Sequence, residues 1–565
     1  MIESTSLGEA LRRSCARHAG KPAMLIPEGS SRRALSYAEF YERVRGYAGA
    51  LGGLGVRRGD RVVIHSENCA EWAFADWACQ TLGAIVTPIY PTLPADQVQY
   101  IVADCGAKLV LSGSSELAGR VSGVSVALLT GSSDSVAGRA TGSGLSLEEF
   151  EAGISATGPE DVATIVYTSG TTGTPKGAVL THGGFTFLCE AVRHSIPIDE
   201  TDTFLSFLPM SHIFERMAGQ FLPIALGSTI AYSKGLASLA REMVEVRPTV
   251  MLCVPRFLEA TQGRILDAMR KESGLKRFLF EATLRAGSRR FHGQASMFYG
   301  LLDSLVGAKV RARTGGRIRF FVSGGAALPE AVEEFYFSFG LLVLQGYGLT
   351  ETSAGTCINH PDRNMPGTVG EPVDGMELKI AEDGEVLIRG PGVMREYWHL
   401  PEDTAAAIDA EGWFHSGDIG EMREGRLKIT DRKKDLIVLS NGKNVAPQPI
   451  EGKLRASRLI AEAVVLGDRM DGCVALIVPE FEALRQAAGM AESEPVSGSE
   501  AAWAVVKAEI DRVNKGLANF EAVKRFALLD AGFSVDTGEL TPTLKVKRKV
   551  VSEKYADVIR KLAEG

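Results

Sequence analysis

Residues 164–182 have the sequence TIVYTSGTTGTPKGAVLTH, in which two apolar runs enclose a loop rich in hydroxyl groups. A bound phosphate needs converging N–H and O–H donors and a cation, and glycine lets the backbone approach it closely. An ordinary hairpin turn needs neither the hydroxyls nor a lysine, so the composition favours a phosphate-binding loop. Its hydroxyl residues are Thr168, Ser169, Thr171, Thr172 and Thr174, its glycines are Gly170, Gly173 and Gly177, and its cation is Lys176.

The position of the lysine separates this loop from the Walker A motif. Walker A requires Gly-Lys followed by Ser or Thr at the start of a helix. Here Pro175 and Gly177 flank Lys176, and the apolar run AVLTH follows. The sequence therefore predicts a different kind of phosphate loop, placed between two strands.

The chain around this loop alternates short apolar runs with helix-like patterns. Strands are expected at 61–65, 84–90, 108–112, 203–207, 249–254, 318–323 and 341–345. Such strands separated by helices indicate an α/β domain of mostly parallel sheets with helices on both faces. Residues 113–160, rich in Ser, Gly and Ala, are interpreted as a surface excursion, and residues 257–315 as an inserted helical pair.

The pattern changes to short strands and turns beyond about residue 375. Residues 367–431 are therefore predicted to form a small β-rich subdomain that ends an N-terminal domain of residues 1–431. Strands at 461–467 and 473–479 and helices near 480–489 and 500–518 then predict a smaller, mobile α+β domain over 432–565. We place the boundary near Asp431–Lys434.

Composition narrows the class of protein. A chain of 565 residues is too long for one core, and a net charge of −7 gives no general reason to expect nucleic acid as a partner. The eight cysteines are scattered, with no CxxC pair, which is typical of reduced thiols in a cytoplasmic protein. No signal-peptide pattern or membrane-spanning run is visible. The sequence leaves open whether the protein contacts the inner face of a membrane. It also leaves open whether the protein is a monomer or a homodimer.

Further motifs follow the loop in order: FFVSGGAALP (320–329), QGYGLTET (345–352), GWFHSGDIG (412–420), TDRKKD (430–435) and LTPTLKVKR (540–548). The ring of Tyr347 could stack on a base, and Glu351 could bind Mg²⁺, a hard cation that prefers carboxylate and phosphate oxygens. Glu351, between two threonines after a Gly-Tyr-Gly turn, is poorly suited to burial in an apolar core.

The run YTSGTTGTPKG resembles the signature loop of the AMP-forming adenylating enzymes, a family that includes acyl-CoA synthetases, luciferases and the adenylation domains of peptide synthetases. The resemblance covers essentially the whole chain. It implies that the loop holds the β- and γ-phosphates of ATP and that Gly324, Gly325 and Ala326 border the adenine. It further implies that Gln345, Gly346, Tyr347 and Gly348 form the next nucleotide segment, with Thr350 at the α-phosphate and Glu351 and Thr171 at Mg²⁺.

The same resemblance assigns the C-terminal motifs. Asp418 and Arg432 would bind the ribose, Lys434 would be the hinge, and Lys545 would stabilise charge during adenylation. The run LSNGKNVAP (439–447), with Asn441, Gly442 and Lys443, would face the pantetheine arm of CoA. The family usually has Gly before its catalytic lysine, whereas Leu544 stands here, so Lys547 is an alternative to Lys545.

The acyl substrate is indicated by FLPMSHIFERM (207–217), which resembles the segment that closes the acyl site, with His212 at its gate or as a structural residue. Together with the inserted helices, this run looks most like a bacterial long-chain fatty acid–CoA ligase that uses ATP, Mg²⁺ and CoA. Such an enzyme joins a carboxylate to AMP with release of pyrophosphate and then transfers the acyl group to CoA. The alternatives are a ligase for another acid or a carrier-protein acceptor, and a non-catalytic fatty-acid carrier.

Overall fold

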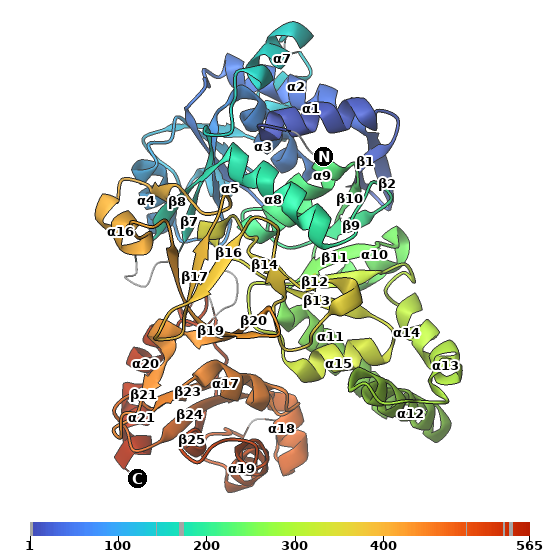
Figure 1. Cartoon of the computed structure of the whole chain (residues 1–565), viewed down its shortest axis with the longest axis vertical. Helices are drawn as coiled ribbons and strands as arrows, with labels where there is room; N and C mark the ends of the chain where they lie inside the picture. Colours follow the sequence, from blue (N-terminus) through green and yellow to red (C-terminus); the bar gives the residue numbers. More distant parts are fainter. Residues whose placement is uncertain are drawn as a thin grey trace.

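The computed structural model describes residues 4–142, 144–168, 174–492, 494–534, 537–541 and 546–564 (Figure 1). A nine-stranded sheet forms one layer of the N-terminal region. Its strands, in spatial order, are β15 (Glu371–Pro372), β14 (Cys357–Ile358), β13 (Leu342–Tyr347), β12 (Phe320–Ser323), β11 (Val250–Cys253), β9 (Thr203–Ser206), β10 (Thr229–Tyr232), β1 (Pro22–Glu28) and β2 (Ser31–Ser36). The strands from β13 to β1 are parallel, and those at the edges are antiparallel.

A seven-stranded sheet forms the second layer. Its order is β18 (Glu396–Tyr397), β8 (Lys176–Thr181), β7 (Val162–Thr168), β4 (Ile85–Ile89), β3 (Arg61–His65), β5 (Leu109–Ser112) and β6 (Ser125–Leu128). Strands β7 and β8 are antiparallel, with Thr168 opposite Lys176. The predicted phosphate loop therefore does connect two strands, which lie side by side in this sheet.

Helices cover both faces of these sheets, which confirms the predicted fold class. Alternate side chains of one strand enter different cores, because successive residues of a strand point to opposite faces. In β11, Val250 and Leu252 join the large central core, while Met251 and Cys253 join a second core. The helices of the N-terminal half are α1 (Leu7–Arg17), α2 (Tyr37–Gly53), α3 (Ala70–Leu82), α4 (Ala95–Asp104), α5 (Ser115–Ala118), α6 (Val136–Ala140), α7 (Leu147–Ser155), α8 (His182–Ser195), the π-helix η1 (Glu215–Phe221), α9 (Leu222–Leu226) and α10 (Leu239–Val246).

The interpretation of residues 113–160 as a surface excursion is wrong. Strand β6 extends the second sheet, and α7 buries Phe150 and Ile154 in the central core. The helix begins at a capping box in which Ser146 and Glu149 satisfy each other's backbone N–H groups. Short elements anchored by one or two apolar side chains leave little periodicity in a sequence, and this is why the region was missed.

The region 257–315 is helical and protrudes at the side of the molecule (Figure 1). It contains most of α11 (Pro255–Arg270), then α12 (Gly274–Phe291), α13 (Tyr299–Leu302), the π-helix η2 (Asp303–Gly307) and α14 (Ala308–Ala312). Helix α15 (Glu330–Ser338) packs against α12. The short helices η3 (Thr350–Thr352) and η4 (Pro361–Arg363) follow β13 and β14.

A four-stranded antiparallel sheet follows, of β16 (Glu377–Ile380), β17 (Glu385–Arg389), β19 (Phe414–Arg423) and β20 (Arg426–Arg432), with α16 (Pro401–Ala407) beside it. Beyond η5 (Lys433–Asp435) and the hairpin β21 (Ile437–Val438)–β22 (Asn444–Val445) lies a separate sheet of β23 (Ile460–Leu466), β24 (Cys473–Pro479) and β25 (Val523–Leu528). Its helices are α17 (Pro447–Arg455), α18 (Phe481–Ala488), α19 (Glu500–Asn514), α20 (Arg548–Lys554) and α21 (Ala556–Glu564). This part has its own apolar core.

The cysteines agree with the prediction of reduced thiols, since all eight lie within the described ranges and are free, seven of them buried. No helix within the described ranges has the length and apolar character needed to cross a membrane.

Candidate active site

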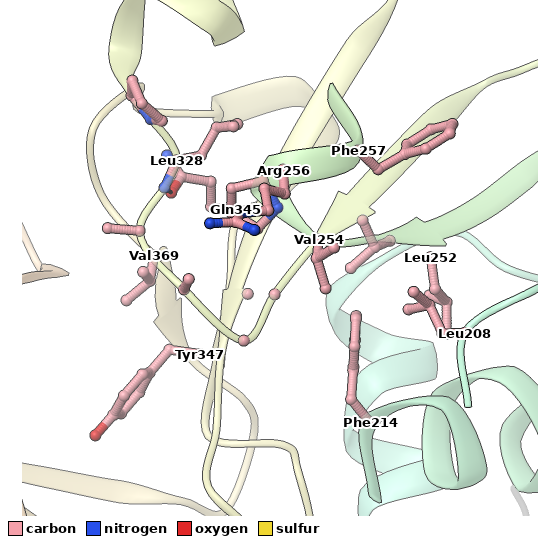
Figure 2. A pocket seen from close by; sticks show the side chains of 18 of the residues that line it. Leu208, Phe214, Leu252, Val254, Arg256, Phe257, Leu328, Gln345, Tyr347 and Val369 are labelled. Atoms are coloured by element: carbon pink, nitrogen blue, oxygen red, sulfur yellow. Dashed lines mark hydrogen bonds between the residues drawn. The ribbon is translucent and has the colours of Figure 1, made fainter. Parts of the chain in front are cut away.

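One cavity of about 3260 Å³ lies between the N-terminal sheets and the C-terminal part (Figure 2). Its wall brings together side chains from motifs that are far apart in the sequence. The predicted site residues that line it are Thr168, Lys176, His212, Gly324, Gly325, Ala326, Gln345, Gly346, Tyr347, Gly348, Thr350, Glu351, Asp418, Arg432 and Lys434.

Six predicted residues lie outside the described residues: Ser169, Gly170, Thr171, Thr172, Gly173 and Lys545. Their neighbours locate the two segments. Thr168 and Lys176 end the paired strands β7 and β8, and Thr541, Val546 and Lys547 line the same cavity. Described residues on both sides of each segment therefore line the cavity.

The structure does not bring Asn441, Gly442 and Lys443 to this cavity. They connect β21 to β22 as an exposed hairpin tip, and the Lys443 ammonium lies 4.6 Å from the ring centroid of Phe520. In this arrangement of the C-terminal part, the hairpin lies outside the residues that form the wall. The sequence analysis assigns these three residues to the pantetheine arm of CoA and not to the nucleotide, and that assignment stays a prediction.

Tyr347, Asp418 and Arg432 form a connected group at one end of the cavity. The Tyr347 hydroxyl donates to Oδ2 of Asp418 over 2.7 Å, and Nε of Arg432 lies 3.2 Å from Oδ1. Asp418 and Arg432 are directly opposite each other on β19 and β20. Burial, then the charge of Asp418, raise the pKa of Tyr347 well above its usual value, so the hydroxyl stays a donor. The group therefore offers a fixed carboxylate beside a cation and an aromatic ring.

Gln345 stabilises this wall through two hydrogen bonds of its side-chain amide. Its Oε1 accepts from the backbone N–H of Leu328 at 3.2 Å, and its Nε2 donates to Glu333 at 3.1 Å. The side chain thereby ties the end of β13 to the segment that follows Gly324-Gly325-Ala326. Gly348 is required for the next turn, because a Cβ there would meet the backbone of Ala354 at 2.3 Å.

Glu351 and Lys176 are linked through a residue that the sequence did not single out. The Tyr397 hydroxyl donates to Oε1 of Glu351 over 2.9 Å, and the Lys176 ammonium lies 5.5 Å from the centroid of the Tyr397 ring. Lys176 also pairs with Asp403 on α16. Both partners lie after residue 390, in a short edge strand and a short helix that leave almost no sequence pattern.

The other end of the cavity is apolar. Figure 2 shows Leu208, Leu252 and Phe257 on the side of the opening that faces away from Tyr347. The ring of Phe214 closes against the backbone of Gly324, where a Cβ would meet it at 3.1 Å. The apolar lining continues between α10, α11, α12 and η2 through Ala240, Val244, Ala260, Ile265, Met269, Leu279 and Val306. Such a wall suits a long hydrocarbon chain.

His212 lines the cavity two residues before Phe214. Its Nδ1 accepts the backbone N–H of Phe214 at 3.1 Å, and its ring meets Tyr90 edge-on with centroids 6.4 Å apart. These contacts fix the ring against the wall, and they leave the predicted roles of gate and structural residue both open.

Glu215 and Arg216, next to His212 in sequence, are buried behind the apolar wall. Arg216 forms a fully buried ion pair with Asp76, with Nε at 2.7 Å from Oδ2. Burial raises the pKa of Glu215 to about 7, against the lowering effect of hydrogen bonds from Ser206 and Gln220. Both residues hold η1 against β9 and α3 rather than contacting the cavity.

Comparisons with known proteins agree with this geometry. Residues 11–398 match the description of the AMP-binding enzyme family, and residues 434–564 match the AMP-binding enzyme C-terminal domain. The chain is 37% identical over 554 residues to the long-chain-fatty-acid–CoA ligase FadD15 of Mycobacterium bovis, covering 92% of this chain and 91% of that protein. It is 33% identical over 537 residues to human long-chain-fatty-acid–CoA ligase 1, covering 86% and 76%.

Solved structures show the same fold. The anthranilate CoA ligase AuaEII in complex with anthranoyl-AMP has a TM-score of 0.75 at 20% identity, covering 97% of both chains. ATP-bound MatB from Rhodopseudomonas palustris has a TM-score of 0.73 at 23% identity, covering 98% of this chain and 99% of that one. The family match over residues 11–398 and the 37% identity to FadD15 show that the chain belongs to the AMP-binding enzyme family.

Proposed function

We propose that this protein is an ATP-dependent fatty acid–CoA ligase for long-chain acids. One observation carries the proposal: a single cavity joins the hydrogen-bonded group Tyr347, Asp418 and Arg432 to an apolar channel bounded by Phe214 and Leu252. The first end suits a nucleoside and the second a hydrocarbon. A carboxylate whose chain fills the channel then lies where it can meet the α-phosphate of ATP.

In the first half-reaction, a carboxylate oxygen attacks the α-phosphorus and the bond to pyrophosphate breaks. The protein contributes position and opposing charge rather than covalent chemistry. Asp418 and Arg432 hold the ribose, Thr350 reaches the α-phosphate, and Lys176 and Lys545 offset the charge of the phosphates. The residues Thr168–Gly173 and Gly324–Ala326 would supply further donors to the phosphates and the adenine.

Glu351 is the carboxylate placed to hold Mg²⁺. No cluster of three or more His, Cys, Asp or Glu suited to a metal occurs within the described ranges. Glu351 is one of several carboxylates on the cavity wall, and Mg²⁺ usually takes one or two protein carboxylates and completes its shell with phosphates and water. Thr171 is the proposed second protein ligand. When bound, the ion neutralises developing phosphate charge.

In the second half-reaction, the CoA thiol attacks the acyl carbonyl and AMP leaves. Asn441–Lys443 belong to this step in our proposal, although they lie away from the cavity now. A rotation of residues 432–565 about Lys434 would exchange the segment around Lys545 for this hairpin. The described neighbours Thr541 and Lys547 at the cavity support the assignment of the present arrangement to adenylation.

The test is a substrate screen. Saturated acids from C6 to C20 are supplied with ATP and Mg²⁺, and pyrophosphate release is measured with and without CoA. We expect the highest kcat/KM at long chains, and acyl-AMP that accumulates without CoA and is consumed when CoA is added. Acyl-AMP that persists after CoA is added would instead indicate the alternative, a fatty acyl-AMP ligase with another acceptor. Absence of acid-dependent pyrophosphate release would indicate a non-catalytic carrier.

We also propose that the channel opens toward an anionic membrane surface. Leu236, Val244 and Leu305 line the cavity with 70%, 50% and 44% of their surface exposed. Arg241, Lys276, Lys309 and Arg313 also line the cavity, as does Glu272, whose carboxylate lies 2.8 Å from the Lys276 ammonium. An apolar rim with excess positive charge fits a lipid surface rich in acidic headgroups.

Flotation with vesicles tests this contact. We expect binding to vesicles with phosphatidylglycerol, little binding to phosphatidylcholine alone, and loss of binding for Leu236→Asp with Leu305→Asp. Met422→Asp is the control, since Met422 is 44% exposed in the four-stranded sheet, away from the opening. Equal binding of the double variant and the wild type would contradict the proposed surface.

A further inference from the structure

Tyr397 touches two groups that the proposed reaction needs, by two different parts of its side chain. Its hydroxyl donates to Oε1 of Glu351 over 2.9 Å, and its ring lies 5.5 Å from the Lys176 ammonium. All three side chains line the cavity. Tyr397 is separated from Glu351 by 46 positions and from Lys176 by far more, so these contacts exist only in the folded chain.

Strand pairing and backbone hydrogen bonds fix the position of Tyr397. Tyr397 lies in β18, which pairs with β8 directly opposite Ala178, two residues after Lys176. The backbone N–H of Met394 also donates to the carbonyl of Glu351 at 2.7 Å, and that of Trp398 donates to the carbonyl of Gly177 at 2.7 Å. Backbone hydrogen bonds therefore hold the segment 394–398 against both the turn at Glu351 and the strand β8, which contains Lys176.

Asp403 is a further partner of Lys176. It pairs with the Lys176 ammonium but is not part of the cavity wall. The ammonium is thus held between a carboxylate on one side and an aromatic face on another, which suits a cation. Asp403 forms its ion pair with the lysine, whereas Tyr397 contacts both the lysine and the acid.

We propose that Tyr397 is a positioning residue that fixes Glu351 and Lys176 relative to each other. The metal-binding carboxylate and the phosphate-binding ammonium are thereby oriented to bind the same triphosphate. Lysine and glutamate have long, flexible side chains, and holding both in place before the nucleotide arrives removes an ordering cost from binding and reaction. The inference rests on the proposed function, because it assigns Glu351 to Mg²⁺ and Lys176 to the phosphates.

The test separates the two contacts. Tyr397→Phe removes the hydroxyl and keeps the ring, so it affects Glu351 only, while Asp403→Asn removes the ion pair and affects Lys176 only. The measurement is calorimetric binding of α,β-methylene-ATP, which cannot be cleaved at the reacting bond, with Mg²⁺ and with EDTA. The ratio of the two affinities reports the metal-dependent part of binding, independent of turnover.

For Tyr397→Phe we expect affinity with Mg²⁺ to fall about tenfold, the size of a lost hydrogen bond to a charged group, and affinity in EDTA to stay within about twofold. For Asp403→Asn we expect both affinities to fall by a similar factor of about three, so that their ratio is unchanged. Tyr41→Phe is the matched control, since it removes another tyrosine hydroxyl beside a glutamate, Glu151 at 3.5 Å, away from the cavity.

A second measurement guards against a merely structural effect. In a Glu351→Gln background, Tyr397→Phe should change the metal-dependent ratio no further, because both substitutions act on one contact. An unchanged ratio in Tyr397→Phe, or additive losses in the double variant, would overturn the inference. Failure of the wild type to bind the analogue at all would overturn the proposed function instead, which keeps the two outcomes distinct.

Discussion

The two ends of the cavity are built in different ways. At the polar end, which we propose as the nucleotide site and call the nucleotide end, polar side chains hold one another in place: Tyr347 holds Asp418, Asp418 holds Arg432, and Tyr397 holds Glu351. At the apolar end, which we propose as the acyl site and call the acyl end, apolar side chains from at least four helices and several strands together form the wall of the cavity. Binding at the nucleotide end therefore depends on individual atoms, whereas binding at the acyl end depends on the volume of the cavity. Substitutions should therefore have large, substrate-specific effects at one end and graded effects at the other.

The largest expected effect is at Lys545. Lys545→Ala removes a charge that opposes the developing negative charge, and adenylation should fall about 10²–10³-fold. Thioester formation from supplied acyl-AMP should be nearly unchanged. Rapid-quench assays of the two half-reactions measure this. Equal loss in both would contradict the separation of the two steps, and loss in Lys547→Ala instead would move the assignment to that lysine.

The next effect concerns the junction between the two parts of the chain. Lys434→Pro restricts the backbone at the proposed hinge, and adenylation should survive while CoA-dependent consumption of acyl-AMP falls at least about tenfold. Asp431, three residues earlier, is buried and accepts the backbone N–H of Gln448 at 3.0 Å, which fixes α17 to this junction. Normal overall turnover of the variant would place the hinge elsewhere.

Asp418→Asn tests whether the nucleotide end can be weakened without affecting the acyl end. The amide keeps the shape of the side chain but loses the charge that pairs with Arg432, and KM for ATP should rise about 10–100-fold. KM for the fatty acid should stay within about twofold, because the acyl end does not involve this group. Asp383→Asn is the control, an acid of the same subdomain that does not line the cavity. Parallel changes in both KM values would argue that the two ends are not separable.

The acyl end should respond to added volume. Ala260→Trp places an indole on α11 where the cavity continues, and kcat/KM for a C16 acid should fall about tenfold relative to a C8 acid. KM for ATP should not change. Asp267→Trp, on the same helix but outside the wall, serves as the control. An unaltered preference for chain length would show that the chain takes another path.

The smallest effect is on stability. The folded pKa of Glu215 is about 7, above its ordinary value of 4.5, because burial disfavours its charge. The folded state therefore holds an extra proton, and stability falls as pH rises from about 5 through 7, by at most about 3 kcal/mol. Glu215→Gln should raise the melting temperature at pH 8 by roughly 2–6 °C and have less effect at pH 5. Identical pH dependence in both proteins would contradict an apolar environment behind the acyl wall.

Sequence and structure differ in what each reveals about these two ends. The alternation of short apolar strands and helices predicted the α/β class. Local motifs indicated Tyr347 and Glu351, because a turn and its functional side chain are neighbours in the chain, and the resemblance of the motifs to a known family assigned Asp418. Tyr397 and Asp403 were missed, since their partners are remote: Asp403 and Lys176 are 227 positions apart. Helix α7 was missed because its two buried anchors give weak periodicity.

The apolar end was predictable only in outline. The run around His212 suggested an acyl site, but the wall arises from β11, α10, α11 and α14 meeting in space, and nothing local in Leu252 or Ala260 marks it. The outward position of Asn441–Lys443 depends on how the C-terminal part is oriented, which motif order does not determine.

The central claim is that a fatty carboxylate held at the apolar end attacks the α-phosphorus of an ATP held at the polar end. Palmitate labelled with ¹⁸O in its carboxylate tests it directly, with mass spectrometry of the nucleotide after turnover with CoA. Attack at the α-phosphorus leaves one carboxylate oxygen on AMP, so we expect one ¹⁸O in the AMP formed. Unlabelled AMP, or ADP with label in inorganic phosphate, would contradict the account.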